Sequence, residues 1–160
     1  MGRVTSTTVI RATPDHAAVV GRMLADFNAE FDTPGPSAAE FAGRLRRLLA
    51  GDDLAVFLGE GDAGPTGFSL VTLRLTHFFD GPLAQLEELY VRPALRDRGI
   101  GSALLQATIA FVRGRGGEEM HINVDEVDVD ARRFYERHGF LNTEPGADHR
   151  MLCYIGELTR

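Results

Sequence analysis

The sequence contains very little cysteine, which excludes a disulfide-stabilised fold. Cys153 is the only cysteine among 160 residues, so no disulfide can form within the chain, and we expect a reducing compartment. Long hydrophobic runs are also missing. No apolar stretch is long enough to cross a bilayer, and the N-terminus lacks the hydrophobic core of a signal peptide. We therefore expect a cytoplasmic protein without a membrane partner. Its length predicts a single domain over residues 1–160.

Basic residues are outnumbered by acidic ones, and metal-ligand spacings are absent. The chain carries 17 Lys and Arg against 23 Asp and Glu, a formal net charge of −6. This balance argues against a nucleic-acid partner and mildly favours a cationic substrate. The five histidines show neither HxxH nor HExxH spacing, so we expect no metal site.

The segment Arg96–Ser102, RDRGIGS, lies between a predicted strand at Leu86–Val91 and a predicted helix at Ser102–Val112. Its two glycines allow the backbone to approach a ligand closely. The first helical turn has unpaired N–H groups and a positive potential, an arrangement that binds phosphate. The two arginines can add charge-assisted contacts. The segment therefore predicts a site for a phosphorylated cofactor.

Two familiar phosphate loops do not fit this segment. A P-loop requires Lys-Ser or Lys-Thr after its second glycine, and none follows Gly101. A dinucleotide fingerprint requires a third glycine where this chain has Leu104, and it also requires an acid on the next strand.

Apolar periodicity, helix caps and turn residues predict the remaining elements. Ser37 and Glu40 form a capping box at the start of the second helix. Strands are predicted over residues 8–12, 54–59, 66–75, 86–91, 120–124 and 150–158, with a short additional strand at Phe140, and helices over residues 13–32, 37–50, 102–112 and 130–138. The order is β-α-α-β-β-β-α-β-α-β. It predicts an α/β fold in which four helices flank a mixed central sheet of six to seven strands.

Three pieces of the sequence resemble the core motifs of the GNAT superfamily of acetyl-CoA-dependent N-acetyltransferases. They are LEELYVRP at Leu86–Pro93, RDRGIGSALL at Arg96–Leu105 and DARRFYERHGF at Asp130–Phe140. Their order and spacing are closest to the branch that acetylates small amines and polyamines. The resemblance implies a GNAT fold, a transferase activity and acetyl-CoA as cofactor, with coenzyme A as the product.

The resemblance also implies how the cofactor is held. In the family, the strand before the loop bulges away from its neighbour, and its open edge hydrogen-bonds the pantetheine arm. The corresponding cofactor-binding residues are Leu89, Tyr90, Val91, Arg96, Asp97, Arg98, Gly99, Ile100, Gly101, Ser102, Asp128 and Tyr135. Asp128 stands where the family often has Asn. An ionised Asp only accepts hydrogen bonds, so an amide contact would be lost while a helix-capping role would survive.

Glu87, Glu88 and Tyr135 are the candidate catalytic residues. The polyamine-acetylating branch carries an acid at the position of Glu87 as the proposed proton acceptor, so we favour Glu87, with Glu88 as the alternative. Strand alternation sends the two carboxylates to opposite faces unless a bulge intervenes between them. The family places a hydroxyl at the position of Tyr135 near the cofactor sulfur, where it can protonate the departing thiolate.

The acceptor site of the resembled fold is built from the first two helices, their connecting loop and the turn around residues 76–82. Acids beside aromatics in these regions suit an ammonium group, and the candidates are Phe27, Glu30, Phe31, Asp32 and Asp80. We therefore expect a small, cationic primary amine, acetylated by direct attack in a ternary complex. A homodimer is common in the family. Two alternatives stay open: a non-catalytic acetyl-CoA-binding sensor or partner domain, and a protein or peptide N-acetyltransferase.

Overall fold

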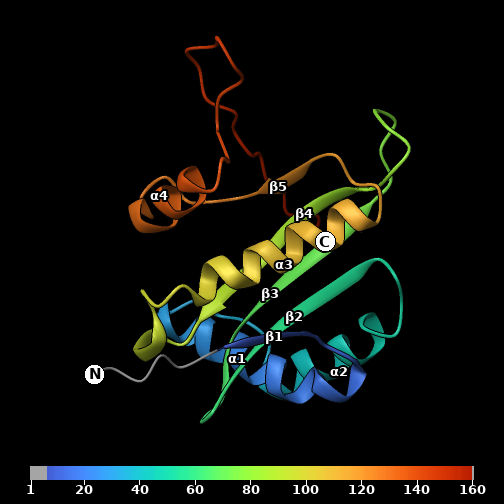
Figure 1. Cartoon of the computed structure of the whole chain (residues 1–160), viewed down its shortest axis with the longest axis vertical. Helices are drawn as coiled ribbons and strands as arrows, with labels where there is room; N and C mark the ends of the chain where they lie inside the picture. Colours follow the sequence, from blue (N-terminus) through green and yellow to red (C-terminus); the bar gives the residue numbers. More distant parts are fainter. Residues whose placement is uncertain (1–6, 160) are drawn as a thin grey trace. The chain divides into compact units, whose positions relative to one another are not determined.

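A five-stranded mixed sheet organises the first part of the chain (Figure 1). Its strands lie in chain order and are β1 (Thr8–Arg11), β2 (Leu54–Gly61), β3 (Gly64–Arg74), β4 (Leu83–Val91) and β5 (Met120–Ile122). Neighbours from β1 to β4 are antiparallel, whereas β5 runs parallel to β4. The computed structural model describes residues 7–159, and the chain divides into two compact units after Ile122.

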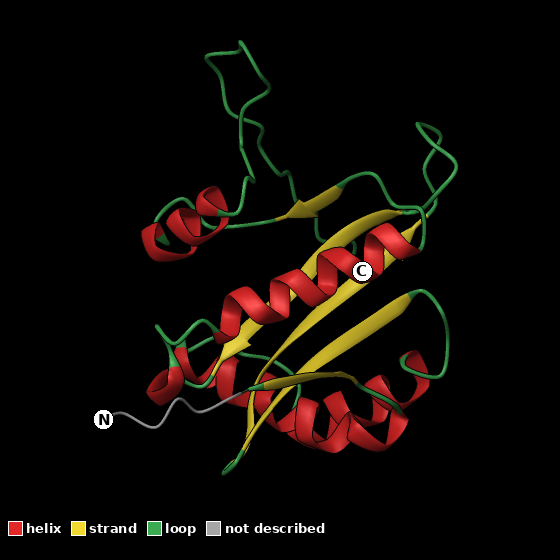
Figure 2. Ribbon diagram, in the orientation of Figure 1, coloured by secondary structure: helices red, strands yellow, loops and turns green. Residues whose placement is uncertain are grey.

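Helices cover both faces of this sheet (Figure 2). The helices α1 (Ala17–Glu30) and α2 (Ala38–Leu48) lie on one face, and α3 (Ile100–Gly114) lies on the other. The predicted capping box starts α2, since the Ser37 N–H donates to Glu40 at 2.8 Å and the Glu40 N–H donates to the Ser37 hydroxyl at 3.2 Å. Two short 3₁₀ helices, η1 (Pro14–His16) and η2 (Pro93–Leu95), precede α1 and α3.

The sheet has a separate hydrophobic core on each face. The core under α1 and α2 includes Met23, Phe68 and Tyr90, and the core under α3 includes Val71 and Leu104. Burial of these apolar surfaces is the main favourable term that holds the helices on the sheet. This packing fixes the positions of β4 and of the two ends of α3.

The second unit, residues 123–159, contains the helix α4 (Val129–Arg137). Asp128 caps it, since its carboxylate accepts from the Ala131 N–H at 3.0 Å. This is the capping role that the sequence predicts for Asp128. Gly139 follows the helix with a φ of 87°, a conformation that glycine adopts without a Cβ clash.

The predicted strands at residues 150–158 and at Phe140 are wrong. Residues 151–159 have no regular secondary structure, and over the described residues 7–159 the sheet has five strands instead of six to seven. The short apolar run at residues 151–155 is typical of a strand, but a strand also needs a hydrogen-bonded neighbour. Among the described residues, only the Met151 N–H finds a backbone acceptor in this segment, the Asn142 carbonyl at 2.6 Å.

The other predicted elements are present, with ends that shift by a few residues. For example, β4 begins at Leu83 instead of Leu86, and β5 ends at Ile122 instead of Val124. None of the described helices is long and apolar enough to cross a membrane.

Candidate active site

β4 carries one more residue than β3 at its centre, and that residue is Glu87. Leu70 pairs with Glu88, but the next residue of β3, Val71, pairs with Leu86. Such a bulge interrupts the alternation of side chains, so consecutive residues can face the same side.

Both carboxylates of the bulge lie on the α1/α2 side of the sheet. Leu70 belongs to the core under those helices, and Thr72 follows it on the same face of β3. The Thr72 hydroxyl donates a hydrogen bond to Oε1 of Glu87 at 2.7 Å. Tyr90, two residues after Glu88, also packs into that core. The bulge therefore breaks the strand alternation and brings Glu87 and Glu88 to the same face.

The two neighbouring carboxylates differ in their environment. Glu88 is half-buried whereas Glu87 is exposed. Burial raises the pKa of Glu88 above its ordinary value, and the nearby charge of Glu87 raises this pKa further. A carboxylate with a raised pKa is a better proton acceptor near neutral pH. Glu88 is thus the better placed of the two candidates for general-base chemistry.

The edge of β4 that faces β5 is open beyond the bulge. β5 pairs only with Ala84, Gln85 and Leu86, so the two strands part where Glu87 begins. No described strand pairs with residues 87–91 on that side. An extended ligand with amide groups can hydrogen-bond such an edge like an additional strand.

A turn with free backbone amides follows β4 and leads into α3. Gly99 has a φ of 82° with open space around its α-carbon, and α3 begins at Ile100. Within the described chain, the amides of residues 97–102 donate to no backbone or side-chain acceptor, and Ala103 makes the first bond, to the Gly99 carbonyl. These groups at a helix N-terminus fit a pyrophosphate group.

Arg96 and Glu30 form a bidentate ion pair. The Nη1–Oε1 and Nη2–Oε2 distances are 2.5 and 2.7 Å. The hydrogen bond from Arg96 lowers the pKa of Glu30 and raises the pKa of Arg96. The structure therefore pairs a predicted acceptor-binding residue with a predicted cofactor-binding residue.

The C-terminal half of α1 lies over β4. The Phe27 ring is 5.2 Å from the Tyr90 ring and 5.4 Å from the Phe31 ring. Burial raises the pKa of Tyr90, and the charge of Asp26 contributes in the same direction. Asp26 therefore faces this part of β4, although the sequence analysis did not select it. Its spacing of four residues from Glu30 places both acids on one face of α1, and this was the available signal.

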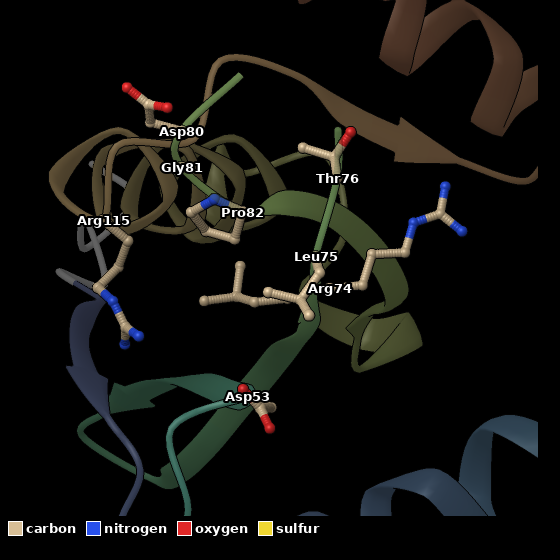
Figure 3. A pocket seen from close by; sticks show the side chains of 9 residues that line it. Asp53, Arg74, Leu75, Thr76, Asp80, Gly81, Pro82 and Arg115 are labelled. Atoms are coloured by element: carbon tan, nitrogen blue, oxygen red, sulfur yellow. The ribbon is translucent and has the colours of Figure 1, made fainter. Parts of the chain in front are cut away.

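Asp80 lies elsewhere, beside a pocket at the C-terminal end of α3 (Figure 3). The pocket has a volume of about 420 Å³, and its lining comprises Asp53, Leu73, Arg74, Leu75, Thr76, Asp80, Gly81, Pro82 and Arg115. Leu73 belongs to the core under α3, so the pocket opens on the side of the sheet opposite Phe27. In Figure 3 the Asp80 carboxylate points away from Arg115 and Leu75. The structure does not bring Asp80 together with the other predicted acceptor residues.

Tyr135 lies on α4 within the second unit. Its ring packs edge-on against Phe134 at 5.2 Å and Phe140 at 6.1 Å between ring centroids. These contacts hold the aromatic ring on a short helix that Asp128 caps. The role of Tyr135 in proton transfer stays a prediction.

The chain is similar to known proteins of one family. The model of the acetyltransferase (GNAT) family matches residues 22–140. The aminoglycoside N(6')-acetyltransferase type 1 of Stenotrophomonas maltophilia is 32% identical over 148 residues, which cover 90% of this chain and 92% of that protein.

Two solved structures have the same fold. A proposed acetyltransferase from Arthrobacter sp. FB24 is 50% identical, with a TM-score of 0.87 over 94% of this chain and 96% of that one. The aminoglycoside acetyltransferase AAC(6')-Iy, solved with the bisubstrate analogue CoA-S-monomethyl-acetylneamine, is 20% identical. It has a TM-score of 0.74 over 93% of this chain and all of its own, a likeness of fold.

Proposed function

Because the chain belongs to the acetyltransferase (GNAT) family and its cofactor is acetyl-CoA, we propose that it acetylates a small cationic primary amine by direct attack in a ternary complex. The observation that carries this proposal is the bulge in β4. It sets Glu87 and Glu88 on one face, beside the open strand edge and before the free amides of the loop.

The loop and the strand edge are the proposed cofactor site. The amides of residues 97–102 would hold the pyrophosphate, and Arg98 would add a charge-assisted contact. The open edge of β4 at Leu89, Tyr90 and Val91 would hold the pantetheine arm by backbone hydrogen bonds. Bound acetyl-CoA supplies the acyl thioester.

Glu88 is the proposed general base. It accepts a proton from the acceptor ammonium, directly or through one water, so that the nitrogen lone pair becomes available. As the nitrogen–carbon bond forms and the carbon–sulfur bond breaks, Tyr135 donates a proton to the leaving sulfur. Bulk water then returns a proton to the phenolate and removes one from Glu88. Glu87 acts through its charge, which raises the pKa of Glu88.

Negative charge on the α1/α2 side supports a cationic acceptor. Asp26 lies near the aromatic contact between Phe27 and Tyr90, and Glu87 and Glu88 lie on the same side of the sheet. Such a combination attracts an ammonium group by charge and by cation–π interaction. The Stenotrophomonas relative is named for aminoglycosides, so an amino sugar is one candidate, beside a diamine or a lysine-like amine.

A thiol-release assay with matched acceptors tests the acceptor class. The first pair is 1,4-diaminobutane against 1-aminobutane. The second is a 2-deoxystreptamine aminoglycoside against the same compound with every amine except the acceptor amine acetylated. We expect kcat/KM to be about tenfold higher for the member with the additional positive charge, the scale of one well-placed ion pair. Equal values within each pair would contradict the cationic site. A lysine peptide that exceeds all small amines would favour a protein or peptide acetyltransferase.

The C-terminal residues 151–158 support a homodimer. They are rich in apolar residues, and Leu152, Tyr154, Ile155 and Leu158 are 70–95% exposed. A second copy supplies both the apolar cover and the hydrogen-bonding partner that the described chain lacks. If each copy buries these side chains and their backbone, the interface covers roughly 1,500 Å², the size of a standard specific interface.

Sedimentation of Ile155→Asp/Leu158→Asp tests this dimer. We expect the wild type to sediment as a dimer at micromolar concentration and the double variant as a folded monomer. Leu75→Asp is the matched control, because Leu75 is also exposed but lies in the first unit. A monomeric wild type, or a double variant that remains dimeric, would refute this interface.

A further inference from the structure

The guanidinium of Arg96 is fully engaged by the protein. Its Nε donates to the Val91 carbonyl at 2.9 Å, and its two terminal nitrogens bind the Glu30 carboxylate. Arg96 thus ties the first residue of the cofactor loop to the end of β4 and to the end of α1. A planar fork held at three points has little freedom to turn toward another anion.

Arg98 has the opposite character. Its side chain is exposed, and within the described residues it makes no hydrogen bond, ion pair or cation–π contact. It is therefore available to a ligand at the amides of residues 97–102, whereas Arg96 is not. From the sequence alone, both arginines have the same predicted role.

Backbone strain is concentrated beside this ion pair. Among the described residues, the only non-glycine residues with a positive φ are Asp97, at 61°, directly after Arg96, and Asp32, at 49°, two residues after Glu30. Such conformations are strained and persist only where the surroundings hold them in place. The ion pair lies where it can hold both.

We propose that Glu30 is a positioning residue for the cofactor loop, which it holds through Arg96, and that Arg98 is the arginine that contacts the pyrophosphate. This inference rests on the proposed placement of the pyrophosphate at the loop. Its consequence is a coupling between the two substrates, because the same ion pair restrains the loop after β4 and the segment that follows α1.

The direction in which Glu30→Gln changes the Kd for coenzyme A separates this inference from its main alternative, direct binding of the phosphates by Arg96. If Arg96 itself bound the phosphates, Glu30 would compete for it, and Glu30→Gln would tighten coenzyme A binding by removing a nearby negative charge. If Glu30 positions the loop, Glu30→Gln weakens binding although it removes that charge. The two accounts therefore predict opposite changes in Kd.

The test is a set of calorimetric titrations with coenzyme A. We expect Glu30→Gln and Arg96→Gln each to raise Kd about fivefold, and the double variant to raise it by the same factor, because both changes break one unit. Arg98→Gln should weaken binding at least tenfold and reduce its dependence on salt, as expected for the direct phosphate contact. Glu60→Gln and Arg113→Gln, exposed changes elsewhere, are the matched controls.

Tighter binding by Glu30→Gln would overturn the inference, and so would additive effects of the two pair variants or an unchanged Arg98→Gln. Arg98→Gln breaks no contact of the described chain, so it tests the inference even if a pair variant folds poorly. In Glu30→Gln the KM for acetyl-CoA should rise while the circular dichroism spectrum stays as in the wild type, which a general loss of structure would not allow. If the wild type itself binds no coenzyme A, the proposed cofactor site fails; the inference fails alone when the wild type binds and Glu30→Gln does not weaken binding.

Discussion

Thr72 on β3 donates a 2.7 Å hydrogen bond to the Glu87 carboxylate on β4, and this contact holds the extra residue of the bulge on the α1/α2 side. Glu88 shares that side and is the more buried of the two acids. The pair therefore acts as a unit, in which one carboxylate tunes the other. Substitutions in this unit, and in the packing that supports it, should have distinct effects.

Replacing Glu87 by Gln should shift the pH dependence of the reaction. The charge of Glu87 is the second cause, after burial, of the raised pKa of Glu88. Its removal lowers that pKa, so we expect the acidic limb of kcat/KM to move to lower pH while the plateau stays within about tenfold of wild type. Asp62→Asn, in the β2–β3 turn, is the control. An acidic limb that stays in place would show that Glu87 does not tune the base.

Glu88→Gln should stabilise the protein at neutral pH. Because the folded-state pKa of Glu88 lies above its ordinary value of 4.5, the folded chain binds more protons than the unfolded chain between those two values. The stability that Glu88 contributes is therefore lost as pH rises from about 4.5 through its folded pKa, and the stability advantage of Glu88→Gln over the wild type grows over that range. Urea unfolding at pH 4 and pH 8 measures this. A stability advantage of the variant that does not grow with pH would contradict the burial argument.

Thr108 joins α3 to β3 through a buried hydroxyl pair. Its oxygen lies 2.7 Å from the Ser69 hydroxyl and donates to the Leu104 carbonyl at 2.9 Å, so Ser69 is the donor to Thr108. Thr108→Val leaves the buried Ser69 hydroxyl without this partner, and we expect a loss of about 1–3 kcal/mol in the free energy of unfolding. Adding Ser69→Ala should recover part of the loss. A Thr108→Val protein as stable as wild type would show that the pair contributes nothing.

Tyr135→Phe should lower kcat by about 100-fold or more, the scale of one lost general acid. The ring contacts with Phe134 and Phe140 survive the change, so circular dichroism should show a folded protein. Steady-state kinetics measure the change, and Tyr154→Phe is the control. An unchanged kcat would assign protonation of the sulfur to water.

Features that depend on neighbouring residues could be predicted from the residues themselves, whereas features that depend on distant pairing could not. The loop after β4 and the capping box at Ser37 follow from neighbouring residues. Strand alternation alone predicts that Glu87 and Glu88 lie on opposite faces of the sheet. The bulge that brings them to one face depends on the register with β3, which neighbouring residues do not determine. Likewise, Arg96 and Glu30 are 66 residues apart in sequence, and nothing local indicates their contact.

The failed prediction of a strand at residues 150–158 has the same cause. A short run of apolar residues indicates a preference for extended backbone, but it does not identify the neighbouring strand. Asp80 shows a related limit: the resemblance grouped it with Phe27, but the sheet separates its pocket from that side.

The most direct test of the central claim compares turnover and cofactor binding in Glu88→Gln, with Glu60→Gln as control. Single-turnover thiol release with the best amine and saturating acetyl-CoA measures the chemical step, and calorimetry measures the affinity for coenzyme A. We predict that Glu88→Gln binds coenzyme A within about twofold of wild type but releases thiol at least 100-fold more slowly at neutral pH. Release at the wild-type rate would contradict Glu88 as the base. A wild type that binds coenzyme A, but whose release no amine accelerates, would contradict the proposed acetylation of an amine.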